Sequence, residues 1–264
     1  MEEVADRTDV MPLLVLDSLL PRQVLGLAVR NPALLRLLRE RIRSEVPTVG
    51  VMGTARVAGP AGGGVVYLRR GVEAIVDVQE AEGGGEGDGA AAKEGVVRIE
   101  LRAGRRFEIE GDVMEVEGEG WTEARVRFLD STDEEEQEGS DALAAAISKA
   151  GRLTAPTLWD GSASGRPLSA IDRWIELATE RERTPGQIEE LVRGLGPVPP
   201  ADRPTERALY VGALINPLPA MGVAVEIRPA LLTAEGAERR VDIALEGILG
   251  SIRHMDGSAR LWRD

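Results

Sequence analysis

Few residues of this 264-residue chain have the types that catalysis requires. His254 is the only histidine, and the absence of cysteine excludes thiolate nucleophiles, disulfides and cysteine-ligated metals. The segment 161–165, GSASG, is similar to the G-x-S-x-G turn of hydrolases, but Ala163 stands where the nucleophile would be. We therefore interpret it as a linker turn. His254 follows a helical pattern, where a cation favours the helix dipole, so we expect a capping or surface role.

Two further segments could bind phosphate or a metal, and both have simpler interpretations. The Gly-rich residues 83–89 lack the Lys-Ser/Thr pair of a phosphate-binding loop, and their acidic neighbours would repel phosphate. The acidic run 133–138 lacks the ligand spacing of an EF-hand and is typical of a solvated linker. We expect no cofactor, no metal and no enzymatic activity. An enzyme with an unrecognised site remains the less favoured alternative.

The composition narrows the possible partners. The formal net charge is −13, which disfavours nucleic acids and anionic membrane surfaces because both would repel the chain. No apolar stretch approaches the roughly 20 residues of a membrane span. The acidic N-terminus lacks the basic start and apolar core of a signal peptide. We expect a cytoplasmic protein, with organelle import left open.

The first half of the chain has the pattern of a β-rich domain, which we assign to residues 1–130. Asn31 and Pro32 are typical of a helix start, and Pro47 ends that helix. Residues 80–95 form a Gly/Glu-rich segment too polar to pack, which predicts a flexible hairpin loop. Apolar runs with partial alternation predict strands over residues 11–17, 24–29, 48–54, 72–79, 96–101 and 123–129.

The second half has helical patterns. Residues 131–165 form an acidic and Gly/Ser-containing linker with a short helix, and residues 166–264 form an α-helical bundle. Predicted helices follow Thr184-Pro185, cover 206–215 and begin again near 233. Trp174 lies among apolar residues at helical spacing, so we expect it in the core.

The order of these elements resembles the LON substrate-binding domain, the N-terminal domain of Lon-type ATP-dependent proteases. The segments that carry the resemblance are 10–54, 71–79, 103–109, 121–130 and 208–252. The resemblance implies an α+β fold, namely a bent β pseudo-barrel of the PUA-like type with one helix, followed by a helical bundle. One departure concerns Leu20-Pro21-Arg22, where family members often have Phe-Pro-Gly. Because arginine cannot adopt positive φ as easily as glycine, we expect this turn to differ in shape.

The resemblance further implies a non-catalytic module that binds exposed apolar or extended segments of other proteins, including unfolded polypeptides, as a stand-alone adaptor. Strand addition to a sheet edge and docking in a groove are the two physical routes. The alternative is a substrate receptor that works with a ubiquitin ligase or a small ligand. The oligomeric state stays open. Arginines can bind acidic peptides, although we favour a solvated turn at residues 104–106 with Phe107 pointing inward. Tryptophans often anchor interfaces, although a core position would explain them equally. The candidate contact residues are Arg22, Arg105, Arg106, Trp121 and Trp159.

Overall fold

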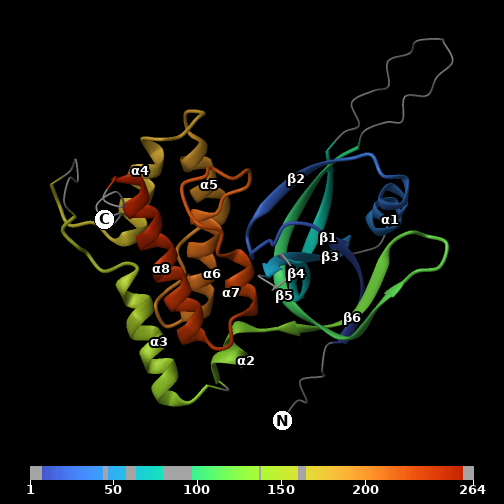
Figure 1. Cartoon of the computed structure of the whole chain (residues 1–264), viewed down its shortest axis with the longest axis horizontal. Coiled ribbons are helices and arrows are strands. Elements are labelled where there is room, and N and C mark those ends of the chain that lie inside the picture. The colour runs from blue at the N-terminus through green and yellow to red at the C-terminus, as the bar shows by residue number, and fades with distance from the viewer. Residues whose placement is uncertain are drawn as a thin grey trace. The chain divides into compact units, whose positions relative to one another are not determined.

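A computed structural model describes residues 8–43, 47–57, 64–79, 97–136, 138–159 and 165–257 (Figure 1). The chain divides into two compact units. The β unit comprises Met1–Leu19 and Val24–Phe128, and the helical unit comprises Leu20–Gln23 and Leu129–Asp264. The four-residue segment 20–23 therefore belongs to the helical unit, although the strands on both sides of it belong to the β unit. The predicted loop at 80–95 lies outside the described residues.

The β unit contains six strands in one mixed sheet, in the order β2-β5-β4-β3-β1-β6. The β1–β3 pair is parallel, whereas β1–β6, β2–β5, β3–β4 and β4–β5 are antiparallel. β5 also pairs with β6, so the sheet bends back on itself without forming a regular barrel. With the helices this gives the α+β class that the sequence predicted. The strands are β1 (Thr8–Val15), β2 (Val24–Val29), β3 (Thr48–Val57), β4 (Gly64–Gln79), β5 (Val97–Glu115) and β6 (Thr122–Leu129).

The core of the β unit forms around Phe107, which is fully buried on β5. Phe107 is paired with Gly71 of β4. A Cβ atom at Gly71 would lie 2.7 Å from the ring, and one at Gly50 of β3 would lie 3.1 Å from it, so both glycines make room for the ring. The sequence predicted that Phe107 points inward, which is confirmed. The expected turn at residues 104–106 is wrong, because these residues continue β5. Arg106 pairs with Val72 of β4, and the register shifts between this pair and the next one, Ala103 with Ala74.

The helix α1 (Pro32–Ile42) of the β unit starts where the sequence indicated. The Asn31 side chain accepts hydrogen bonds from the backbone N–H groups of Ala33 and Leu34, at 2.9 and 3.3 Å. Leu37 and Leu38 are its buried residues. The local cap and the apolar spacing are therefore sufficient to explain this element.

The helical unit is built around α6 and α8, which pack against each other, while α3 and α4 also pack against α8 (Figure 1). Nearly every residue of α6 is buried, as expected for a helix that is apolar around its whole circumference. Trp174 of α4 is fully buried, which confirms the predicted core position. The helices are α2 (Ser131–Glu136), α3 (Ser140–Arg152), α4 (Ala170–Thr179), α5 (Gln187–Leu195), α6 (Pro204–Ile215), α7 (Arg228–Thr233) and α8 (Ala237–Met255).

Candidate functional site

The helical unit contains an apolar groove of about 660 Å³ between α8 and the loop that precedes α7. We call it the α8 groove. Residues of α8 that recur every three or four positions form one wall, and the loop and the start of α7 form the other. The lining residues are Gly222, Val223, Ala224, Val225, Ile227, Ala230, Arg239, Ile243, Glu246, Gly247, Gly250, Ser251 and His254.

Two glycines of α8 shape the groove. A Cβ atom at Gly247 would lie 2.7 Å from Cδ1 of Ile227, so glycine allows the loop to approach the helix closely. A Cβ atom at Gly250 would meet nothing within 4 Å. The groove is therefore open next to Gly250, although glycine in a helix costs about 0.5–1 kcal/mol relative to alanine.

Hydrogen bonds fix the loop over α8. The side chain of Asn216, just after α6, donates to the carbonyl oxygen of Val225 at 3.2 Å and accepts from the N–H of Ile227 at 3.1 Å. The hydroxyl of Ser251 donates to the carbonyl oxygen of Val223 at 2.7 Å and accepts from Nε1 of Trp174 at 2.8 Å. The loop wall is thus held at three backbone positions, so the groove is largely preformed.

The rim of the groove carries charges of both signs. Arg239, Glu246 and His254 are exposed and follow one another along α8. The loop side of the groove carries Val225, which is 80% exposed although it is apolar. Apolar walls with a few charged groups at the edge are typical of binding sites. Within the described ranges no group of three or more His, Cys, Asp or Glu side chains could hold a metal ion.

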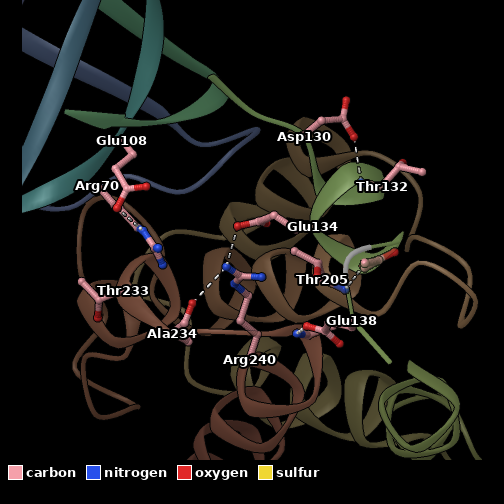
Figure 2. A network of polar contacts seen from close by, with 12 residues as sticks. Arg70, Glu108, Asp130, Thr132, Glu134, Glu138, Thr205, Thr233, Ala234 and Arg240 are labelled. Atoms are coloured by element: carbon pink, nitrogen blue, oxygen red, sulfur yellow. Dashed lines mark hydrogen bonds and ion pairs between the residues drawn. The ribbon is translucent and has the colours of Figure 1, made fainter. Parts of the chain in front are cut away.

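An acidic network joins α2 to α6 and α8 (Figure 2). A carboxylate oxygen of Glu134 lies 3.1 Å from the buried guanidinium of Arg240, which also donates to the carbonyl oxygen of Ala234 at 2.9 Å. Glu135 accepts from the N–H of Thr205 at 2.9 Å, in the first turn of α6.

Glu138 completes this network by accepting from the N–H of Ala237, at the start of α8. The interpretation of residues 133–138 as a solvated run is therefore wrong for Glu134, Glu135 and Glu138, whose carboxylates satisfy helix N-termini and a buried cation. Asp133 of the same run is exposed, as the interpretation expected. Glu135 is only 7% exposed, and burial raises the pKa of its carboxyl above the ordinary value.

Arg105 and Arg106 lie in the middle of β5. Arg105 is exposed and binds the carboxylate of Glu73 through two hydrogen bonds of 2.8 and 3.0 Å. Its guanidinium also lies 3.8 Å from the ring centre of Phe128, and the hydrogen bond to Glu73 raises the pKa of Arg105. Arg106 is 3% exposed. Peptide contact by either residue stays a prediction, and Arg105 is the one with an accessible side chain.

The two candidate tryptophans are half-buried and lie in different units. Nε1 of Trp121, just before β6, lies 3.4 Å from a carboxylate oxygen of Glu123. Nε1 of Trp159, between α3 and α4, donates to the carbonyl oxygen of Leu168 at 2.8 Å. Their role in partner contact is likewise a prediction, and neither lines the α8 groove.

Arg22 has the one positive φ of a non-glycine residue in the described part of the chain, at 73°. Arginine thus adopts a conformation that favours glycine, and a difference in shape between this turn and that of family members stays a prediction. Its guanidinium donates to the carbonyl oxygens of Leu195 and Pro197, at 3.2 and 2.9 Å. These are carbonyls at and just beyond the C-terminus of α5, where a cation is favoured. Arg22 therefore has a structural role within the helical unit.

Sequence reasoning did not identify the α8 groove, since its two walls come from segments about 25 residues apart. His254 was expected to cap the helix or lie on the surface, and it is exposed in the last turn of α8, at the end of the groove. The signal that could have indicated the groove is the pair of glycines, Gly247 and Gly250, within the helical pattern of α8.

No protein-family model and no curated protein matches this chain. The Lon N-terminal domain protein from Xanthomonas campestris aligns with 18% identity and a TM-score of 0.43, covering 90% of this chain and 97% of that one. The N-terminal domain of the Mycobacterium avium complex Lon protease aligns with 14% identity and a TM-score of 0.48, covering 90% and 97%. Across the described residues, no helix is both long and apolar enough to span a membrane.

Proposed function

We propose that this chain is a non-catalytic protein-recognition module that binds exposed apolar segments of partner polypeptides in the α8 groove. The observation that carries the proposal is the preformed apolar groove in the helical unit. Its volume of about 660 Å³ lies in the range of roughly 300–1,000 Å³ that is usual for ligand sites. The sequence resemblance to LON substrate-binding domains supports the same class of function.

The chemistry of the groove favours apolar side chains. Val223, Ile227 and Ile243 supply aliphatic walls, and burial of apolar surface against them gains about 25 cal/mol per Å². Val225 at the edge is left in water in the free protein, so a bound apolar segment would cover it. Charges of both signs at the rim would orient a peptide rather than supply most of the affinity.

A second surface suits extended segments. In the described part of the chain β2 pairs only with β5, so its other edge has no strand partner. Its sequence, VLGLAV, contains no charge and no proline, the features that usually protect an edge. Addition of a peptide strand there would use backbone hydrogen bonds. The adaptor role, in which the chain acts without a catalytic domain of its own, belongs to this proposal.

The test is a titration of the chain with fluorescein-labelled, reduced and carboxymethylated α-lactalbumin, an unfolded polypeptide, followed by anisotropy. In the Gly250→Leu variant the new side chain starts in the open part of the groove, since nothing lies within 4 Å of the new Cβ. We expect at least tenfold weaker binding.

The matched control is Gly194→Leu in α5, where the added Cβ also meets nothing within 4 Å and the position is exposed outside the groove. This variant should bind as the wild type does, because both substitutions remove a helical glycine but only one fills the groove. Equal binding by all three proteins would contradict the proposal. Co-purification of ubiquitin-ligase subunits from cells would favour the receptor alternative.

A further inference from the structure

Three residues in line on the outer face of α8 form the rim and the open part of the α8 groove. Glu246, Gly250 and His254 follow one another at intervals of four residues, so they lie along one stripe of the helix. Glu246 and His254 are exposed, and a Cβ atom at Gly250 would meet nothing within 4 Å. The side chains of Glu246 and His254 form no hydrogen bond or ion pair with the residues that the structure describes. The stripe therefore offers an acceptor and a donor with a gap between them.

The stripe is complementary to a second copy of itself. Gly250 is four residues from Glu246 and four from His254. Each of these steps is about 6 Å along the helix axis and about 40° around it, in opposite directions for the two neighbours. A two-fold axis through Gly250, perpendicular to the helix, reverses both displacements. It therefore places Glu246 of one copy directly opposite His254 of the other, and it does so twice.

The apolar positions on the same face match in size. Ile243, which lines the groove, is seven residues before Gly250, and Gly257 is seven residues after it, just beyond α8. The same two-fold axis brings Ile243 of one copy toward Gly257 of the other. A Cβ atom at Gly257 would meet nothing within 4 Å, so there is room for an aliphatic side chain. At the axis itself Gly250 faces Gly250, which allows the two helices to approach closely.

The polar groups of the stripe suit this arrangement. A histidine side chain donates an N–H whether it is neutral or protonated, and the carboxylate of Glu246 accepts. Val225, which is 80% exposed at the edge of the groove, borders the contact and would lose water contact there. The net charge of −13 on each copy opposes association. At physiological ionic strength the Debye length is about 8 Å, so repulsion between distant charges is largely screened, whereas adjacent pairs are less affected.

We infer that two copies of this chain associate through their α8 grooves, with the α8 helices antiparallel, Gly250 on the two-fold axis and Glu246 of each copy bound to His254 of the other. The contact involves one helix face from each copy, so the dimer is weak and dissociates at roughly micromolar concentration. The inference rests on the proposed function only for its consequence. Since the dimer covers the groove, an apolar segment of another protein must displace the second copy before it binds.

The first experiment measures the contact by disulfide formation between copies. Because the chain has no cysteine, the Gly250→Cys variant carries one thiol, which the inference places beside the thiol of the second copy. The control is Gly194→Cys in α5, also at an exposed and open position of a helix. At equal protein concentration we expect Gly250→Cys to form disulfide-linked dimers at least tenfold faster, as measured by non-reducing electrophoresis. Equal rates for the two variants would overturn the inference.

The second experiment exchanges the two polar groups and measures the dissociation constant of the dimer by sedimentation equilibrium. Glu246→Lys removes the acceptor and His254→Glu opposes two carboxylates, so each should weaken the dimer at least tenfold. The double variant Glu246→Lys with His254→Glu restores opposite charges across the axis and should return to within about threefold of the wild type. Both positions are exposed, so folding is retained, which ellipticity checks.

The control for the charge exchange is Glu190→Lys, at an exposed position of α5. It changes the net charge by the same amount as Glu246→Lys and should leave the dissociation constant unchanged. A double variant as weak as the single ones, or a wild-type chain that stays monomeric up to about 1 mM, would overturn the inference.

The third experiment separates the inference from the proposed function. The disulfide-linked Gly250→Cys dimer should bind the unfolded α-lactalbumin at least tenfold more weakly than the same protein after reduction, because its grooves are covered. Equal binding by the two forms would overturn the inference. A dimer that passes the cross-linking and charge-exchange tests without any polypeptide binding by the monomer would support the inference and refute the proposed function instead.

Discussion

Arg22 provides a sharp test of how the segment 20–23 is held in the helical unit. Its φ of 73° costs an L-residue about 1–2 kcal/mol relative to glycine. Against this, its guanidinium donates two hydrogen bonds, to Leu195 and Pro197. Because one bond is part-buried and the other exposed, we assign them about 2 kcal/mol together, at the low end for charged donors.

The two contributions can be separated by two substitutions. Arg22→Ala loses both hydrogen bonds and keeps the strain, so it should lower the free energy of unfolding by about 2 kcal/mol. Arg22→Gly loses the same bonds but relieves the strain, so its loss should be only about 1 kcal/mol. The predicted order of stability is wild type, then Arg22→Gly, then Arg22→Ala.

The assay is urea unfolding followed by the helical ellipticity signal, which reports mainly on the helical unit. Arg193→Ala is the control, because Arg193 and its partner Glu189 on α5 are 69% and 78% exposed and their pair should contribute less than about 0.5 kcal/mol. An Arg22→Ala variant as stable as the wild type, or more stable than Arg22→Gly, would refute the reasoning.

Three further predictions concern buried positions, each measured as a change in urea midpoint. Because the pKa of Glu135 is raised in the folded state, its protonation favours folding as pH falls, and this contribution is lost as pH rises through the folded pKa. Glu135→Gln should therefore be at least as stable as the wild type at pH 7, and the difference in stability between the two should shrink as pH falls. Glu135→Ala, in contrast, leaves the N–H of Thr205 unpaired and should cost about 1–3 kcal/mol. A Glu135→Gln variant clearly less stable at pH 7 would contradict this. Gly71→Ala should cost about 2 kcal/mol or more, since its Cβ would lie 2.4 Å from a backbone oxygen of β3, while Gly104→Ala, with its nearest atom at 3.6 Å, should cost less than half as much. Gln23→Ala should cost about 2 kcal/mol, because the buried amide donates to the carbonyl oxygen of Ala213 within α6 at 3.2 Å and to that of Asn216 just after α6 at 2.9 Å. A change below about 0.5 kcal/mol would show that this side chain does not anchor segment 20–23.

Elements with local signals could be predicted from the sequence. Asn31 and Pro32 mark the start of α1, and the spacing around Trp174 identifies a core helix, because caps and periodicity involve residues within a few positions of one another. The helix expected after Thr184-Pro185 begins slightly later, at Gln187, since Gly186 takes a left-handed conformation before it.

Features that depend on distant partners could not be predicted. The run 133–138 looks solvated by composition, but the groups that pair with it are at Thr205, Ala237 and Arg240, roughly 70–105 positions away. The segment 104–106 has the composition of a turn, yet it is part of the strand β5, which pairs with β4. The α8 groove forms only where α8 and the loop before α7 come together, and the glycines of α8 are its one sequence signal.

The most direct measurement of the central claim is hydrogen–deuterium exchange of the full chain with and without saturating unfolded α-lactalbumin. The account predicts slower exchange in the loop 222–227 and at exposed amides near the end of α8, because the bound segment covers the α8 groove. The Gly250→Leu variant should lose this protection, and the Gly194→Leu variant should keep it. Protection confined to other segments, or the same protection in the Gly250→Leu variant, would contradict the account.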